Sequence, residues 1–237
     1  DSIAYAQRIQ QAMLPTDEFI QKKLPNSFVL LKPKDVVSGD FYWVADQNGK
    51  VYFAACDCTG HGVPGAFMSM IGNSLLNEMI IENNIQDTNL ILDQVSDKVK
   101  ISLEQKGQEN QSRDGMDMVL CRLNEKKNEL MFTGAKNPLV LIRDGEVFEY
   151  KGDKRPVGFY LGKEIKFTAQ NIKIKKNDML YIYSDGFPDQ FGGEKGKKYM
   201  AGKFKKYLLS ISELSAEEQQ KAIDKEFNNW KGDLEQI

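Results

Sequence analysis

The chain has 237 residues, and its 32 basic and 34 acidic side chains leave a formal net charge of −2. This balance gives no basic field that would attract nucleic acid or anionic lipid, so a protein or a small molecule is the expected partner. No apolar run approaches the ~20 residues of a membrane helix and no signal peptide heads the sequence, which predicts a soluble, cytoplasmic chain without membrane contact.

The first segment predicts an amphipathic leader helix over residues 1–14. Apolar side chains recur at about 3.5-residue spacing before Pro15 stops the helix: Tyr5 or Ala6, Ile9, and Ala12 or Met13. The helix either packs on its own domain or forms the end of a longer coiled coil, and both alternatives stay open. We therefore divide the chain into a leader at residues 1–15 and one domain at residues 16–237.

A β-hairpin is predicted after a short strand candidate at residues 27–31. Two apolar runs, 41–45 and 51–55, flank Asn48-Gly49, and an Asn-Gly pair in this setting is the strongest short-range hairpin signal. Asp40 precedes the first run and Asp57 follows the second. Antiparallel pairing would bring both carboxylates to the end away from the turn, where a cation could be held.

The residues after Asp57 predict a tight glycine turn of the kind found at binding sites. Two glycines bracket His61, and glycine allows positive φ or a close backbone approach before Pro64 opens a helix. His61 either holds this turn in shape or helps to protonate a leaving group, since its ordinary pKa is near 6.5. Three cysteines and one histidine are too few for a disulfide framework or a good zinc set, so we expect reduced, structural cysteines.

The rest of the chain predicts two helices, a series of strands and two further helices. Apolar residues three and four apart place helices at 64–83 and 89–106, followed by an exposed polar loop at 107–113. Strands at short intervals indicate an antiparallel meander: 116–123, 129–133, 139–142, 146–150, 165–174 and 179–184. The composition of residues 192–198 predicts a mobile flap. Helices at 202–209 and 215–230 close the chain, the second with a capping box between Ser215 and Glu218.

This order of elements is satisfied by layers of antiparallel sheet with helices outside. The expected fold class is α+β, an antiparallel β-sandwich flanked by helical layers with an N-terminal helical leader.

Three acids share one position in this pattern. Asp40, Asp57 and Asp185 each lie at the end of an apolar strand beside a glycine turn. Gathered acids resist ionising together unless a cation lies among them, and oxygen ligands suit Mg²⁺ or Mn²⁺. A single Asp beside Gly is usually a turn former, so the hypothesis depends on their joint occurrence. Asp114 and Asp117 stay open between strand-edge acids and additional ligands.

Four ordered motifs resemble those of the bacterial SpoIIE and RsbU-like branch of the metal-dependent (type 2C, PPM) protein phosphatases. They are Ser38-Gly39-Asp40-Phe41-Tyr42, the turn from Asp57 to Ala66, Gly134 to Pro138, and Ser184-Asp185-Gly186. The resemblance spans roughly Tyr5 to Ile237 and implies two β-sheets between helical layers (αββα). It also implies hydrolysis of phosphoserine or phosphothreonine on a regulatory protein of the anti-sigma-factor-antagonist kind, under an upstream sensor joined through the leader helix.

The resemblance also implies roles for individual residues. Asp57 would bridge two metal ions, and Asp40 and Asp185 would each bind one, so that Asp57 and Asp185 are the candidate catalytic residues. The carbonyl of Cys58 would be a further ligand, and Asp189 would support the site or bind a third ion. The cofactors would be two Mn²⁺ or Mg²⁺ ions, which can activate water without a protein nucleophile.

Two further motifs have plausible structural roles. Residues 134–138 resemble a turn of the family, and Arg155 lies in a segment that resembles its R-x-P-x-G motif. Arg155 is either an ion-pair partner within its loop, which is the favoured interpretation, or a contact to a phosphate. Nucleotide binding lacks support, because no phosphate-cradling glycine loop followed by Lys and Ser or Thr occurs.

The sequence departs from the family at its end. Relatives usually finish with a strand that begins with an Asp-Asp pair, the second acid being a ligand, whereas this sequence ends at Asp233–Ile237. Either the domain lacks that strand, or the protein continues beyond the residues given, and both alternatives stay open. The alternative function is a catalytically weak or inactive signalling module that binds a partner and forms a homodimer through its leader helix.

Overall fold

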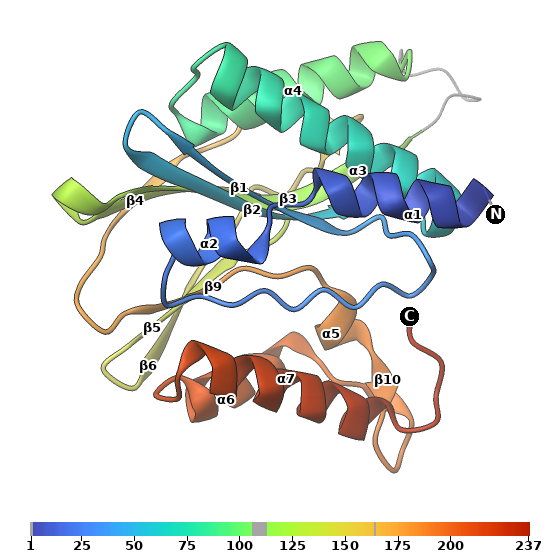
Figure 1. Ribbon diagram of the computed structural model, residues 1–237, viewed down its shortest axis with the longest axis vertical. Coiled ribbons are helices and arrows are strands. Elements are labelled where there is room, and N and C mark those ends of the chain that lie inside the picture. Colours follow the sequence, from blue (N-terminus) through green and yellow to red (C-terminus); the bar gives the residue numbers. More distant parts are fainter. Residues whose placement is uncertain (1, 106–112, 164) are drawn as a thin grey trace.

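The computed structural model describes residues 2–105, 113–163 and 165–237. Two antiparallel β-sheets lie face to face, and helices cover the outer face of each (Figure 1). Layers in the order helix, sheet, sheet, helix confirm the expected α+β sandwich. Of the predicted polar loop at 107–113, only Arg113 lies within the described residues.

The larger sheet has six strands. Its order is β1 (Phe41–Gln47), β2 (Lys50–Cys58), β3 (Gly115–Asn124), β4 (Glu129–Ala135) and β8 (Gln170–Lys173), with β7 (Val157–Gly158) also paired to β3. The smaller sheet has the order β6 (Glu146–Tyr150), β5 (Leu139–Arg143) and β9 (Met179–Tyr181). The predicted hairpin is confirmed. The later strands are divided between the two sheets instead of forming the single meander that was predicted, because the chain changes sheet after β4, after β6 and after β8.

Helices form the two outer layers. Helix α3 (Gly62–Leu76), its π-helical continuation η1 (Asn77–Glu82) and α4 (Thr88–Ser102) pack on the larger sheet. Helices α6 (Ala201–Ile211) and α7 (Ala216–Lys231) pack on the smaller one, and α7 begins with the predicted capping box. The leader helix α1 (Ser2–Met13) contacts α3 (Figure 1). No helix in the described ranges is long and apolar enough to cross a membrane.

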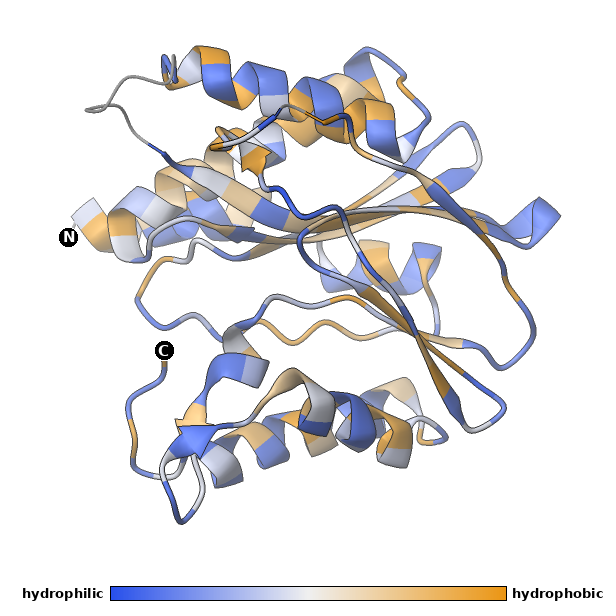
Figure 2. Cartoon of the chain, turned by 180° about the vertical axis from the view of Figure 1, so that it is seen from behind, coloured by the Kyte–Doolittle hydropathy of each residue, from blue (hydrophilic) through white to orange (hydrophobic). Residues whose placement is uncertain are grey.

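Strand alternation separates the core into three layers. Along β3, Met118 and Leu120 contact the helices of the first outer layer, whereas Val119 between them faces the second sheet. In the second sheet, Leu141 lies in the layer between the sheets and Val140 packs against the opposite helices. The apolar segments of these buried strands are visible in Figure 2. Because successive side chains point to opposite faces, strands buried on both sides read as continuous apolar runs.

Leu92→Ala is expected to destabilise the protein by about 2–5 kcal/mol, because removing a buried Leu side chain loses apolar burial and leaves a cavity. Leu92 is 0% exposed in the core under α4. Leu90 on the same helix is 47% exposed, so Leu90→Ala is the matched control, with an expected change within about 0.5 kcal/mol. Urea unfolding of both variants measures the difference, and equal losses would contradict this assignment of the buried face.

Several predicted elements differ in the structure. Residues 27–31, the predicted short strand, carry no strand, and side chains bind carbonyls in and just after this segment: Val29 O accepts from Gln220 Nε2 at 2.7 Å and Lys32 O from Gln236 Nε2 at 2.6 Å. Helix α2 (Asp17–Lys23), capped by Thr16, was not predicted. The strand expected at 165–174 is shortened to β8, since only residues 170–173 find a partner in β4.

The expected flap at residues 192–198 belongs to a short hairpin, β10 (Phe191–Gly192) paired with β11 (Lys197–Lys198). The Gly193 N–H donates to the carbonyl of Trp230 at 2.9 Å, which ties this hairpin to the end of α7. A Cβ at Gly192 would lie 1.9 Å from the same carbonyl oxygen. The glycines that suggested a flap therefore permit a close backbone contact.

Candidate active site

The β1–β2 hairpin places two acids at the open end of the larger sheet. Its turn has φ of 54° at Asn48 and 71° at Gly49, as a tight turn of this type requires. The register pairs Phe41 with Cys56, so the residues just before and after them, Asp40 and Asp57, come together. Phe41 and Cys56 point into the helical side of the sheet, and alternation turns both acids toward the second sheet.

The second sheet contributes Asp185. It follows β9 and lies at the N-terminus of the short helix α5 (Gly186–Asp189). The carboxyls of Asp40 and Asp185 both lie close enough to that of Asp57 to raise its pKa. Ser184 Oγ also donates to Asp40 Oδ2 at 2.7 Å across 144 residues of sequence. The three acids that the sequence analysis selected therefore meet where the two sheets face one another.

Burial and mutual repulsion control the charge of this group. Burial, followed by the charges of Asp40 and Asp185, raises the pKa of Asp57 to about 8. Burial also raises the pKa of Asp40, although hydrogen bonds from Ser184 and Asp57 oppose the increase. Both effects follow from burial and from the neighbouring acids, because adjacent carboxylates in a partly buried site resist ionising together without a compensating cation.

A fourth acid and a lysine complete the group. Asp117 on β3 lies directly opposite Asp57 in the sheet register, and burial raises its pKa against the opposing effect of Lys136. The Lys136 ammonium lies 3.2 Å from Asp117 Oδ1. Lys136 has a φ of 63°, and its N–H donates to the Asp153 carbonyl at 2.8 Å. This non-glycine residue in the left-handed region lies in the Gly134–Pro138 turn that sequence analysis treated as structural.

Three glycines fix the backbone behind the acids. A Cβ at Gly39 would lie 2.6 Å from the Gly60 carbonyl oxygen, and a Cβ at Gly65 only 2.5 Å from the same atom. Gly60 itself has a φ of 87°. The segment before Asp40, the turn after Cys58 and the start of α3 can cross this closely because none of them carries a side chain there.

His61 and the cysteines have mainly structural surroundings. His61 Nδ1 lies 2.8 Å from Asp35 Oδ2, and the imidazole is 76% exposed, which supports its role in holding the turn. Cys56, Cys58 and Cys121 are free and buried, as expected for structural thiols. The Cys58 side chain packs in the core on the helical side of the sheet, away from the acids, so its backbone carbonyl is the candidate ligand.

Two other candidates have partners away from the three acids. The Asp189 carboxylate lies 2.8 Å from Lys198 Nζ on β11, so its proposed role toward a third ion stays a prediction. Arg155 is buried, donates to the carbonyl of Ile165 and to Ser96 Oγ, and stacks on an aromatic ring. Since the partners of Arg155 among the described residues are neutral, the predicted ion pair is wrong. Because the side chain is buried, it is also not exposed to contact a phosphate.

The donor atoms of the site fit a hard divalent cation. Asp40, Asp57 and Asp185 offer only carboxylate oxygens, the ligands that Mg²⁺ and Mn²⁺ favour. Burial raises the pKa values of Asp40 and Asp57, an effect that a bound cation would oppose. Within the described parts of the chain, no group of three or more His, Cys, Asp or Glu side chains already has the arrangement of a metal site. The charges of Asp40 and Asp185 both raise the pKa of Asp57, and a cation bound among the three carboxylates would offset this repulsion.

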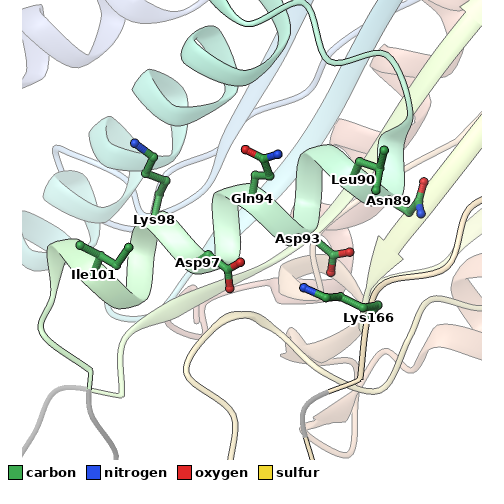
Figure 3. Close-up of a pocket in the computed structure, with 8 residues that line it drawn as sticks. All are labelled: Asn89, Leu90, Asp93, Gln94, Asp97, Lys98, Ile101 and Lys166. Atoms are coloured by element: carbon green, nitrogen blue, oxygen red, sulfur yellow. The ribbon is translucent and has the colours of Figure 1, made fainter.

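A separate hollow lies beside α4. It contains none of the acids, and Figure 3 shows the residues that line it: Asn89, Leu90, Asp93, Gln94, Asp97, Lys98, Ile101 and Lys166. Asp93 in this lining accepts a hydrogen bond from the N–H of Phe167 at 3.1 Å. That carboxylate therefore helps to anchor the segment after β7 on α4, which is a structural role.

Comparison with known proteins identifies relatives of this chain. The profile of Stage II sporulation protein E (SpoIIE) matches residues 47–235, and a comparison with curated proteins finds no match. The SiaA-PP2C domain of Pseudomonas aeruginosa is 31% identical, with a TM-score of 0.88 over 100% of this chain and 92% of that chain.

More distant structures share the fold. The PP2C phosphatase domain of SpoIIE from Bacillus subtilis, solved with a fragment of its regulatory domain, has a TM-score of 0.65 at 18% identity over 84% of this chain and 56% of that chain. The structure of the RsbU and RsbW domains of a Mycobacterium tuberculosis protein has a TM-score of 0.62 at 17% identity, over 81% of this chain and 51% of that chain.

Proposed function

This chain belongs to the SpoIIE family of PP2C-type phosphatase domains, and from that premise we propose that it hydrolyses phosphoserine or phosphothreonine on a regulatory protein with the help of Mn²⁺ or Mg²⁺. The observation that carries the proposal is the meeting of Asp40, Asp57 and Asp185 between the two sheets. Their mutual repulsion in a partly buried site is what bound cations would relieve.

Individual residues have distinct roles in this proposal. Asp57 lies between Asp40 and Asp185 and would be shared by two cations, and the Cys58 carbonyl would be a further ligand. Ser184 orients Asp40 through its 2.7 Å hydrogen bond. When bound, the cations supply activation of a water molecule and neutralise charge on the phosphate. The single histidine and the buried thiols leave this chemistry without an evident side-chain nucleophile.

The partner in this proposal is a phosphoprotein of a bacterial signalling system in the cytoplasm. An anti-sigma-factor antagonist is the candidate substrate, since a structure of related fold joins RsbU and RsbW domains in one chain. An upstream sensor attached through α1 would control the activity. Dimerisation through α1 would suit this arrangement, because Ile3, Tyr5 and Ile9 on that helix are exposed.

The proposed activity is tested with purified protein and a phosphoserine peptide. We expect hydrolysis that rises with added Mn²⁺ and stops in excess chelator, together with calorimetric binding of Mn²⁺. Activity should return once added Mn²⁺ exceeds the chelator, which shows that the chelator removed the metal and did not unfold the protein. A folded protein that binds no Mn²⁺ and leaves the peptide intact would refute the proposal and favour the inactive signalling module.

A further inference from the structure

Gln10 connects the leader helix to the backbone beside the acids. Its Nε2 donates to the Ser38 carbonyl at 2.6 Å, and its Oε1 accepts from the Ser38 N–H at 2.9 Å. Nε2 also donates to Ser69 Oγ on α3 at 2.8 Å. One amide side chain therefore satisfies both backbone polar groups of a residue 28 positions away.

Ser38 passes this restraint on to Asp40. Ser38 Oγ accepts from the Asp40 N–H at 3.0 Å, and Ser38 is only 8% exposed. Gly39, between them, is packed so closely against the Gly60 carbonyl that even a methyl group would not fit. The three residues Ser38 to Asp40 therefore have little freedom to move relative to one another once Ser38 is held.

Ser69, the second partner of Gln10 Nε2, is itself held within α3. Ser69 donates its own hydroxyl hydrogen to the Ala66 carbonyl at 2.8 Å within α3, which orients its oxygen toward Gln10. Helix α1 has no fully buried residue, and its apolar Ala6 and Met13 are only half-buried, so apolar burial alone gives it a limited hold. The hydrogen bonds of Gln10 are thus a main element of its docking, beside the bond from Asn73 Nδ2 to the Met13 carbonyl at 3.3 Å.

We propose that Gln10 is a positioning residue for Asp40, holding the Ser38–Asp40 segment so that the Asp40 carboxylate lies beside that of Asp57, where a cation would bind. The proposal rests on the metal-dependent function proposed above. A side-chain amide carries a donor and an acceptor on adjacent atoms, so Gln10 can bind both backbone groups of Ser38 at once. Groups that orient a metal ligand typically change metal affinity about 10–100-fold when removed.

The test compares Gln10→Ala with Gln11→Ala, since Gln11 is the exposed neighbour on the same helix. We expect Gln10→Ala to weaken Mn²⁺ binding by about tenfold in calorimetry and to lower kcat more than it changes KM. In metal-free protein, hydrogen exchange of the Ser38 and Asp40 amides is expected to accelerate, because their partners are lost or loosened. Gln11→Ala should change none of these quantities.

Gln10→Glu separates hydrogen bonding from packing. It keeps the length of the side chain and the acceptor for the Ser38 N–H, but removes the donor to the Ser38 carbonyl. We expect it to behave like Gln10→Ala, whereas a side chain needed only for its volume would be rescued by Glu.

Each outcome decides a separate claim. Unchanged exchange at Ser38 and Asp40, or unchanged Mn²⁺ affinity in a protein that binds Mn²⁺, would overturn the role of Gln10. Absence of Mn²⁺ binding in the unmodified protein would instead overturn the proposed function, and the exchange measurement would still show whether Gln10 holds the segment.

Discussion

Asp57→Asn is expected to lower Mn²⁺-dependent phosphatase activity by about 10³-fold or more, because the carboxylate between Asp40 and Asp185 is the one that two cations would share. The neutral amide keeps the shape of the side chain but removes the charge that would hold both ions together. Initial rates on a phosphoserine peptide measure the loss, and calorimetry measures the accompanying loss of Mn²⁺ affinity.

The same substitution is expected to stabilise the metal-free protein. The pKa of Asp57 is raised to about 8 in the folded chain by burial and by its neighbours, whereas the unfolded chain releases that proton near pH 4. The folded state therefore holds more protons than the unfolded state between these values, and its stability falls as pH rises through the interval. Asn is free of this penalty, so the melting temperature should rise more at pH 8 than at pH 6.

Asp144→Asn is the matched control, since Asp144 is exposed in the β5–β6 turn and has a φ of 51° that Asn tolerates. It should leave activity and metal affinity unchanged. Full activity in Asp57→Asn would contradict the proposed mechanism. A lower melting temperature of metal-free Asp57→Asn would contradict the claim that the neighbouring carboxylates destabilise the metal-free site.

Gly65→Ala is expected to damage both the fold and the site. Helix propensity alone predicts a stabilisation, since Gly65 lies within α3 and Ala is the better helix former. However, the added Cβ would lie 2.5 Å from the Gly60 carbonyl oxygen and 3.0 Å from the Gly39 Cα. The contact should prevail, costing about 1–3 kcal/mol and moving the turn after Cys58 away from the segment that carries Asp40.

The expected readouts for Gly65→Ala are a melting temperature lower by about 2–12 °C and a weaker response of activity to Mn²⁺. Gly202→Ala provides the control, because nothing lies within 4 Å of a Cβ at this position in α6. That substitution should stabilise the protein by up to about 1 kcal/mol without changing activity. A stabilised, fully active Gly65→Ala protein would show that the glycine crossing does not matter.

Local patterns in the sequence predicted most of the elements correctly. The Asn48-Gly49 turn, the capping box at Ser215 and the apolar spacing of α3 and α4 depend on neighbours within a few residues. The prediction was wrong where an extended segment lacks a strand partner. Residues 27–31 were predicted as a strand, but side chains of α7 and of the C-terminal segment bind the carbonyls of Val29 and Lys32 instead.

The candidate site was only partly predictable for a related reason. Asp40 and Asp57 are joined by one hairpin, so the sequence indicated their proximity directly. The position of Asp117 opposite Asp57 depends on the register between β2 and β3, which a one-residue shift would reverse. The sequence did not indicate that Lys136 pairs with Asp117. That ion pair depends on the left-handed backbone conformation of Lys136, which its residue type does not predict.

The sequence by itself determined which residues could carry the chemistry: carboxylates at strand ends, glycines in the turns beside them, and a chain with a single histidine. Only the tertiary structure decided that the end of β9 in the second sheet places Asp185 beside Asp40 and Asp57. The tertiary structure also decided that Gln10 binds the backbone of Ser38. These contacts join segments that are far apart in sequence. Short-range periodicity fixes elements, but their relative placement follows from packing two sheets and their helices around shared apolar layers.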